Sequence, residues 1–261
     1  LPPRNRHVHY ADFVHNTSWK RPTLASARTI WAVITLVAII ATWAETATRG
    51  PVNPFNFFGY FTLQSNSLLV IVAAIAGIAG FMRPSPQSRW IVVLRSLTTV
   101  CMVIVGIVYA TLLAPLGAEG GAPVPWANWV MHIAGPTLVA IDWIFARDRE
   151  PLSWRIAMMQ LIYPITWVTV VLARGATDGW VPYPFLNPNQ GYGAVSFYVA
   201  IIAVTFLLAS LLVVWWSRRR FWVGCGGASR RGCGRGRWGR RVRNRRPPAR
   251  GRLVRGARRS R

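Results

Sequence analysis

The sequence predicts an all-α integral membrane protein, a bundle of six transmembrane helices. Its apolar residues fall in long blocks with almost no charge, and several blocks reach the roughly 20 residues that a helix needs to cross the hydrocarbon core. None of the blocks alternates apolar and polar residues as a membrane β-strand does. Helices are therefore the remaining way to satisfy the backbone in lipid.

The blocks divide the chain into a polar N-terminal segment (1–27), a transmembrane domain (28–216) and an Arg/Gly-rich tail (217–261). The six expected spans are 28–48, 58–82, 91–113, 128–146, 155–173 and 194–216.

The orientation follows from the basic residues, because cytoplasmic loops are enriched in Lys and Arg. The N-terminal segment and the second and fourth loops carry most of them: Arg4, Arg6, Lys20, Arg21, Arg28, Arg83, Arg89, Arg95, Arg147, Arg149 and Arg155. The loops on the opposite face carry only Arg49 and Arg174. This alternation predicts a multi-pass protein of the cell membrane with both termini in the cytoplasm.

The net charge of +24 belongs mostly to the tail. Residues 218–261 contain 18 Arg and no acid, whereas the other 13 basic residues face all seven acids. This composition predicts disorder. One interpretation is attraction to anionic lipid headgroups, and a second is nonspecific binding to nucleic-acid phosphates. A third is that the tail is a translation artefact of GC-rich codons read out of frame. No specific nucleic acid is expected.

Cysteine-based metal or redox motifs and a pair of haem ligands are missing from the sequence. Cys101, Cys225 and Cys233 form no CxxC pair, and Cys101 is expected to be a small buried apolar residue. A bis-histidine haem needs two facing histidines, and His132 is the only one in an expected span. We therefore predict no cofactor and no metal.

Charged residues inside spans are costly, so each is a candidate for pairing or for function. Arg95 and Asp142 have the same expected depth in the third and fourth spans. An intramembrane ion pair is the favoured interpretation, and a proton relay is the alternative. Glu45 and Arg49 have the i, i+4 spacing of a pair on one helix.

A polar stripe opens the second span. Helical spacing puts Phe58, Thr62, Ser65, Asn66 and Leu69 on one face, which should point into the bundle. Hydrogen bonding between helices is one interpretation, and a site lined by Thr62 and Asn66 is the other.

A histidine in the fourth span has the same expected depth as Thr62. Pro136 follows His132 at i+4, so the His132 carbonyl loses its helical donor and the helix should kink. His132 is expected to be either a structural residue or the general base of a nucleophile. Pro164 should free the carbonyl of Gln160 in the same way, and the Pro- and aromatic-rich loop 180–188 should cap the outer end of the bundle.

These motifs resemble, in order, those of the bacterial six-span family labelled "Pr-six-Pr". The matching elements are 57–66 (FFGYFTLQSN), 132–136 (HIAGP) with Asp142 and Trp143, and 183–188 (YPFLNP), and the resemblance covers about 28–220. That family is distantly similar to the androgen-induced-gene and FAR-like proteins, which hydrolyse fatty-acid esters of hydroxy fatty acids with an intramembrane Thr and His. The resemblance implies a bacterial inner-membrane protein with Thr62 as nucleophile and His132 as base.

Two functions are therefore carried forward. The first is an intramembrane threonine hydrolase of lipid esters, with Thr62 and His132 as catalytic residues and Ser65 or Asn66 as oxyanion donor. Its partners would be membrane lipids and a lipid-ester substrate. The second is a non-enzymatic membrane protein, a small transporter or an assembly subunit.

Overall fold

The structure, a computed structural model, describes residues 20–82, 86–146 and 148–225. These residues form helices and loops without a β-strand, which confirms the predicted all-α class. The α-helices are α2 (Lys20–Thr48), α3 (Pro54–Phe57), α4 (Phe61–Met82), α5 (Arg89–Val108), α6 (Pro125–Trp129), α7 (Gly135–Phe145), α8 (Trp154–Met159), α9 (Ile162–Thr177) and α10 (Tyr192–Cys225). Two π-helical turns, η1 (Tyr109–Leu113) and η3 (Val130–Ala134), and the 3-10 turns η2 (Ala114–Gly120), η4 (Pro184–Leu186) and η5 (Pro188–Gln190) complete the described part.

Five helical segments of the described chain are long and apolar enough to cross a membrane. They are Pro22–Thr48, Phe61–Met82, Arg89–Gly117, Trp154–Thr177 and Tyr192–Arg219. The fourth expected span is helical as α6, η3 and α7 in succession, but the π-helical turn divides it into short pieces. The five apolar segments suggest a membrane protein, whereas six crossings and the orientation stay predictions.

Two helix starts, those of α2 and α4, change where the predicted polar residues lie. α2 begins at Lys20, before residue 28, so that Arg28 lies inside a formed helix. α4 begins only at Phe61, because Asn53 caps the separate short helix α3. Phe58 therefore precedes α4 and is 42% exposed, so its expected place on the buried polar face is wrong.

The last helix extends past the predicted start of the tail at residue 217. The Ser217 hydroxyl accepts a hydrogen bond from the Leu152 amide (3.1 Å), and Arg218 donates to the Leu152 carbonyl (3.1 Å). These contacts hold the next turn of α10 in helical form, and the helix ends at Cys225. The rest of the predicted tail, 226–261, lies outside the described residues, as do residues 1–19 of the N-terminal segment.

Two prolines interrupt their helices as the sequence predicts. In the fourth expected span, Gly135 donates its amide to the Val130 carbonyl, five residues earlier, which is a π-helical bond just before Pro136. In the fifth, the helix breaks at Gln160 and Leu161, between α8 and α9, because Pro164 has no amide for the Gln160 carbonyl.

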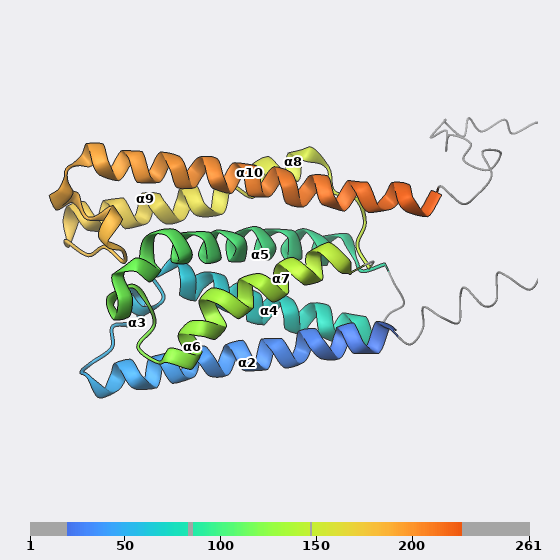
Figure 1. The fold of residues 1–261 in the computed structure, drawn as a ribbon, viewed down its shortest axis with the longest axis horizontal. Helices are drawn as coiled ribbons and strands as arrows, with labels where there is room; N and C mark the ends of the chain where they lie inside the picture. The colour runs from blue at the N-terminus through green and yellow to red at the C-terminus, as the bar shows by residue number, and fades with distance from the viewer. Residues whose placement is uncertain (1–19, 83–85, 147, 226–261) are drawn as a thin grey trace, which may run out of the picture. The chain divides into compact units, whose positions relative to one another are not determined.

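The helices pack in two groups. α2 packs closely on α4, where a Cβ at Gly77 would collide with the Thr29 hydroxyl, and α5 packs on α4 and α7. The backbones of α9 and α10 stay further from these four helices (Figure 1). Large apolar side chains bridge the difference in a cluster that includes Val100, Val171 and Phe206.

One end of the bundle is closed by a network of four charges, and we call it the charged end. Arg28 of α2 contacts Asp142 of α7 (2.8 Å) and Asp148 of the following loop (2.6 Å). Arg95 of α5 contacts the same two carboxylates at 2.7 and 2.9 Å, and also donates to Gln87 (2.9 Å). The predicted pair of Arg95 with Asp142 is present, within a larger ring that joins three helices.

The first described helix and the last both reach the charged end. Arg28 of α2 contacts Asp148, and the last turns of α10 contact Leu152, four residues along the same loop. Figure 1 shows the start of α2 and the end of α10 at the same end of the bundle.

The ionisation of Asp148, the loop carboxylate of this network, depends on the two arginines. Burial disfavours its ionised form, but the guanidinium groups of Arg95 and Arg28 outweigh that cost and hold the pKa of Asp148 well below its usual range. A carboxylate with a lowered folded pKa stabilises the fold above its unfolded pKa, about 3.9. The contribution is lost as the pH falls from there toward the folded pKa.

We expect Asp148→Asn to destabilise the bundle, because it leaves two guanidinium groups facing one carboxylate. Removing one partner of a buried ion pair costs about 3 kcal/mol or more. Thermal unfolding in detergent at neutral pH measures the loss. Glu45→Gln is the matched control, since the pair of Glu45 with Arg49 (3.1 Å) is largely exposed and such pairs contribute about 0.5 kcal/mol. Equal, small losses in the two variants would contradict a structural role for the network.

Candidate functional site

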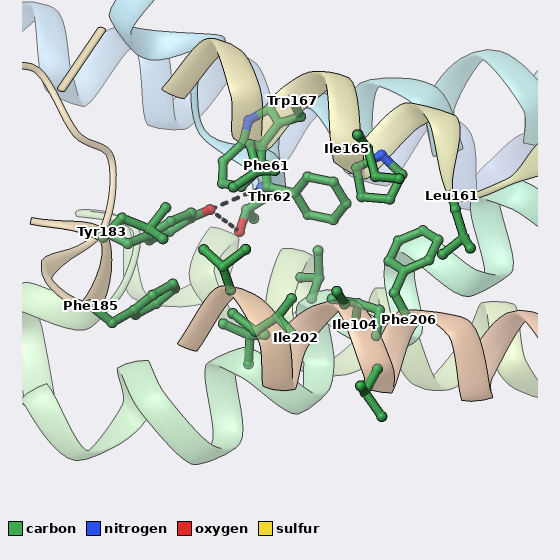
Figure 2. Close-up of a pocket in the computed structure, with 18 of the residues that line it drawn as sticks. Phe61, Thr62, Ile104, Leu161, Ile165, Trp167, Tyr183, Phe185, Ile202 and Phe206 are labelled. Carbon is green, nitrogen blue, oxygen red and sulfur yellow. Dashed lines mark hydrogen bonds between the residues drawn. The ribbon is translucent and has the colours of Figure 1, made fainter. Parts of the chain in front are cut away.

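An apolar cavity of about 350 Å³ lies between α4, α5, α9 and α10. Phe61, Ile104, Ile165, Ile202 and Phe206 contribute to its walls, and the loop 178–191 covers one end. We call this loop the cap and this end of the bundle the capped end. Two of the lining residues carry hydroxyl groups, Thr62 and Tyr183, and Figure 2 shows them pointing toward each other at one end of the cavity. Leu161 and Phe206 lie at the other end.

The tyrosine of the cap also caps helix α4. Thr62 lies in the first turn of α4, where backbone N–H groups have no partner within the helix. The Tyr183 hydroxyl accepts from the Thr62 amide (3.2 Å) and lies 3.3 Å from the Thr62 hydroxyl (Figure 2). One side chain therefore satisfies the helix end and fixes the rotamer of the threonine.

The ring of Tyr183 is held by other aromatic rings. It stacks on Phe185 at 5.2 Å and meets Tyr60 edge to face at 5.6 Å. Burial raises the pKa of Tyr183 to about 12, and its hydrogen bond with Thr62 lowers it by less. The phenol therefore stays protonated at neutral pH and is not a general base.

The cap is tied to α3 and to the turn between α3 and α4. Arg174 donates to the Asn56 side chain (2.9 Å) and to Asp178 (2.8 Å), and its guanidinium stacks on Trp180 at 4.2 Å. A Cβ at Gly59 would collide with the Trp180 ring, so only glycine allows this approach. The capped end is thus built from two loops distant in sequence.

Either hydroxyl can be the donor in the contact between Tyr183 and Thr62. In one of the two arrangements, the Tyr183 oxygen accepts from the Thr62 amide and donates its own hydrogen to the Thr62 hydroxyl oxygen. The Thr62 hydroxyl then keeps its hydrogen for an acceptor in the cavity. The site can present one hydrogen-bond donor to the polar end of an otherwise apolar ligand.

The two residues predicted to support Thr62 serve the packing of α4. The Asn66 amide donates to the Thr62 carbonyl (2.9 Å) and to the Met131 carbonyl (3.4 Å), which links α4 to η3. Ser65 is fully buried beside the Cys101 thiol. Neither side chain lines the cavity, and the contact of Asn66 with Met131 is an interhelical hydrogen bond of the kind that the sequence left open.

The predicted base lies elsewhere. His132 Nδ1 is 3.2 Å from the Asn128 carbonyl oxygen, and the ring stacks on Tyr109 at 4.4 Å. It lines a separate groove with Gly106 and Pro136. Within the described part of the chain, no hydrogen bond joins Thr62 to His132. The catalytic roles of these two residues stay predictions.

Comparisons with protein-family models, with curated proteins and with solved structures give no match for this chain. The resemblance to the six-span family and the activity that it implies therefore stay predictions. Among the described residues, no group of three or more His, Cys, Asp or Glu side chains could hold a metal ion.

Sequence reasoning missed three residues that the structure places at these sites. Arg28 was counted only as a basic residue at the start of the first expected span and Asp148 falls in the loop after the fourth, so neither was predicted to join the pair of Arg95 with Asp142. The predicted cap indicated that the loop with Tyr183 covers the end of the bundle. A loop has no periodicity, however, so the direction of the Tyr183 side chain toward Thr62 could not be predicted.

We expect Tyr183→Phe to lower the thermal stability in detergent. The change leaves the Thr62 amide without its partner, and an unsatisfied buried group costs about 1–3 kcal/mol. Tyr192→Phe is the control, because Tyr192 is 63% exposed at the start of α10. An unchanged melting temperature in Tyr183→Phe would show that the hydroxyl does not cap α4.

Proposed function

We propose that this protein is a six-span membrane protein that binds the hydrocarbon chain of a lipid in the Thr62 cavity. The observation that carries the proposal is the cavity itself, apolar along its walls and with the Thr62 and Tyr183 hydroxyls at one end. Its volume of about 350 Å³ lies within the range of small-molecule sites, which are mostly apolar with a few placed polar groups.

The polar end supplies the selectivity. A lipid chain gains little hydrophobic free energy by moving from the bilayer into an apolar cavity, because both surroundings are hydrocarbon. Binding therefore depends on packing and on the hydrogen bond that the Thr62 hydroxyl donates. An ester or carboxylic acid offers the matching acceptor, so the preferred ligand is an acyl lipid with its carbonyl at Thr62.

Hydrolysis of that ester is the finer form of the same proposal. Thr62 would lie beside the bound carbonyl, as a nucleophile must. The reaction also needs a base, and His132 lines another groove, so a rearrangement of η3 would have to bring it to Thr62. Binding is consequently the better supported function. Transport finds less support, since Arg28, Arg95, Asp142 and Asp148 neutralise one another.

The six-span topology predicts which loops face the cytoplasm. We expect single cysteines at Ser88 and Glu150 to be shielded from an impermeant maleimide in intact cells, and cysteines at Asn53 and Asn189 to react. The background is a chain with Cys225 and Cys233 replaced by Ser. If α6, η3 and α7 do not cross the membrane, Glu150 reacts and Asn189 is shielded.

Lipid capture tests the cavity. In nanodiscs, we expect a palmitoyl ester with a diazirine in its chain to crosslink the wild-type protein, and Ala203→Trp, which fills the cavity from α10, to reduce the yield at least fivefold. Leu212→Trp is the matched control, on the same helix but outside the lining and 59% exposed. Thr62→Val should weaken capture of the ester but not of a diazirine-bearing alkane of equal length.

Two results would change this assignment. Equal crosslinking in the Ala203→Trp and Leu212→Trp variants would remove the cavity as the binding site. Labelling of Thr62 by a fluorophosphonate, lost in Thr62→Val and in His132→Ala, would extend the proposal from binding to hydrolysis.

A further inference from the structure

A second site lies where the two π-helical turns meet. Tyr109 begins η1, His132 lies within η3, and their rings stack at 4.4 Å with 25° between the planes. An open groove of about 570 Å³ runs past both rings and is lined otherwise by small or apolar residues such as Gly106, Ala110 and Pro136. It shares no lining residue with the Thr62 cavity.

A single asparagine positions both rings of this groove. The Asn128 carbonyl faces His132 Nδ1 at 3.2 Å, and its side-chain amide donates to the Tyr109 hydroxyl (2.8 Å). The Asn128 side-chain oxygen accepts in turn from the Ala122 amide (2.9 Å). Every polar atom of Asn128 named here has a partner, so its orientation is fixed, and with it that of the two rings.

These contacts determine which atoms remain for a ligand. A carbonyl oxygen can only accept, so the hydrogen of the imidazole is on Nδ1. The ring is 6% exposed and none of its described contacts is a carboxylate, so the neutral form is favoured over an unpaired buried charge. Its lone pair is then on Nε2, which makes no hydrogen bond with a described residue. Tyr109 already accepts from Asn128, and its own hydrogen is free.

The groove opens on an apolar surface of the bundle. Ile107 and Ile133 line it and are 41% and 44% exposed. Trp126 and Trp129, at the start of the same helical segment, are also exposed, as expected of residues at a membrane interface. His132 lies only one to two turns further along, the depth at which a lipid has its glycerol oxygens.

We propose that this groove binds a neutral lipid with a free hydroxyl, such as a diacylglycerol, which donates its hydrogen to His132 Nε2. Tyr109 donates to a second oxygen of the same headgroup, and the acyl chain lies along Ile107 and Ile133. The site rests on the membrane placement in the proposed function but not on the Thr62 cavity. It gives Asn128 the role of a positioning residue.

The test compares two probes on the full chain in nanodiscs: a diacylglycerol with a diazirine in one chain, and its methyl ether, which cannot donate. One hydrogen bond contributes about 1 kcal/mol, or roughly fivefold in affinity. We expect the wild type to crosslink the diacylglycerol about fivefold better than the ether, with the label in 103–110 or 130–137. His132→Phe keeps the stacked ring without Nε2 and should remove this preference.

Two controls separate this site from the Thr62 cavity and from packing. Ile133→Ala should reduce capture of both probes equally, and Thr62→Val should leave the preference unchanged. Equal capture of the two probes by the wild type, or a preference that survives in His132→Phe, would overturn the proposal. A label that maps outside the two segments in the wild type would do the same, independently of how well any variant folds. If Thr62→Val removes the preference, the hydroxyl is read in the Thr62 cavity instead.

Discussion

The ring of two arginines and two aspartates is the interaction on which the bundle depends. Its members come from α2, α5, α7 and the loop after α7, so it holds three helices in register at one end. Four charges in a poorly solvated position are tolerated only when each is paired on more than one side. The alternating ring of Arg28, Asp142, Arg95 and Asp148 meets that condition, and Gln87 adds an acceptor for Arg95.

With one end held in this way, a proline and a glycine determine how α5 and the segment of η3 and α7 meet further along the bundle. Pro136 removes an amide and η3 replaces the regular helical turn before it, while Gly106 lets α5 approach Pro136 closely. The result is a helix pair that touches at its middle and has polar backbone beside His132. π-helical turns of this kind occur frequently at functional sites.

The backbones of α9 and α10 lie further from their neighbours than those of α2, α4, α5 and α7 lie from one another. Because the backbones of α9 and α10 stay away from α4 and α5, side chains alone fill the gap and leave a cavity beneath the cap. The polar residues of the bundle thus separate into two sites, with Thr62 and Tyr183 in one and His132 and Tyr109 in the other. That separation is the reason for proposing two separate sites and not a single Thr–His pair.

Much of the fold could be read from the sequence, since it depends on local patterns. Long uncharged blocks predicted six spans, of which five are helices long and apolar enough to cross a membrane. Pro136 and Pro164 predicted the interruptions, and matched depth predicted the contact of Arg95 with Asp142. Helical periodicity and chain order determine depth and face along one helix, and no further information was needed for these features.

Partners across the bundle were decided only by the tertiary structure. Depth says how far along its helix a residue lies but not which neighbour that helix faces, so Thr62 and His132 could share a depth and still line different cavities. Loop residues have no periodicity, so neither the contact of Tyr183 with Thr62 nor that of Asp148 with Arg95 could be predicted from the sequence. The sequence by itself determined an all-α chain of apolar helices. The rotation of those helices about their axes, set by packing, decided what the polar residues can do.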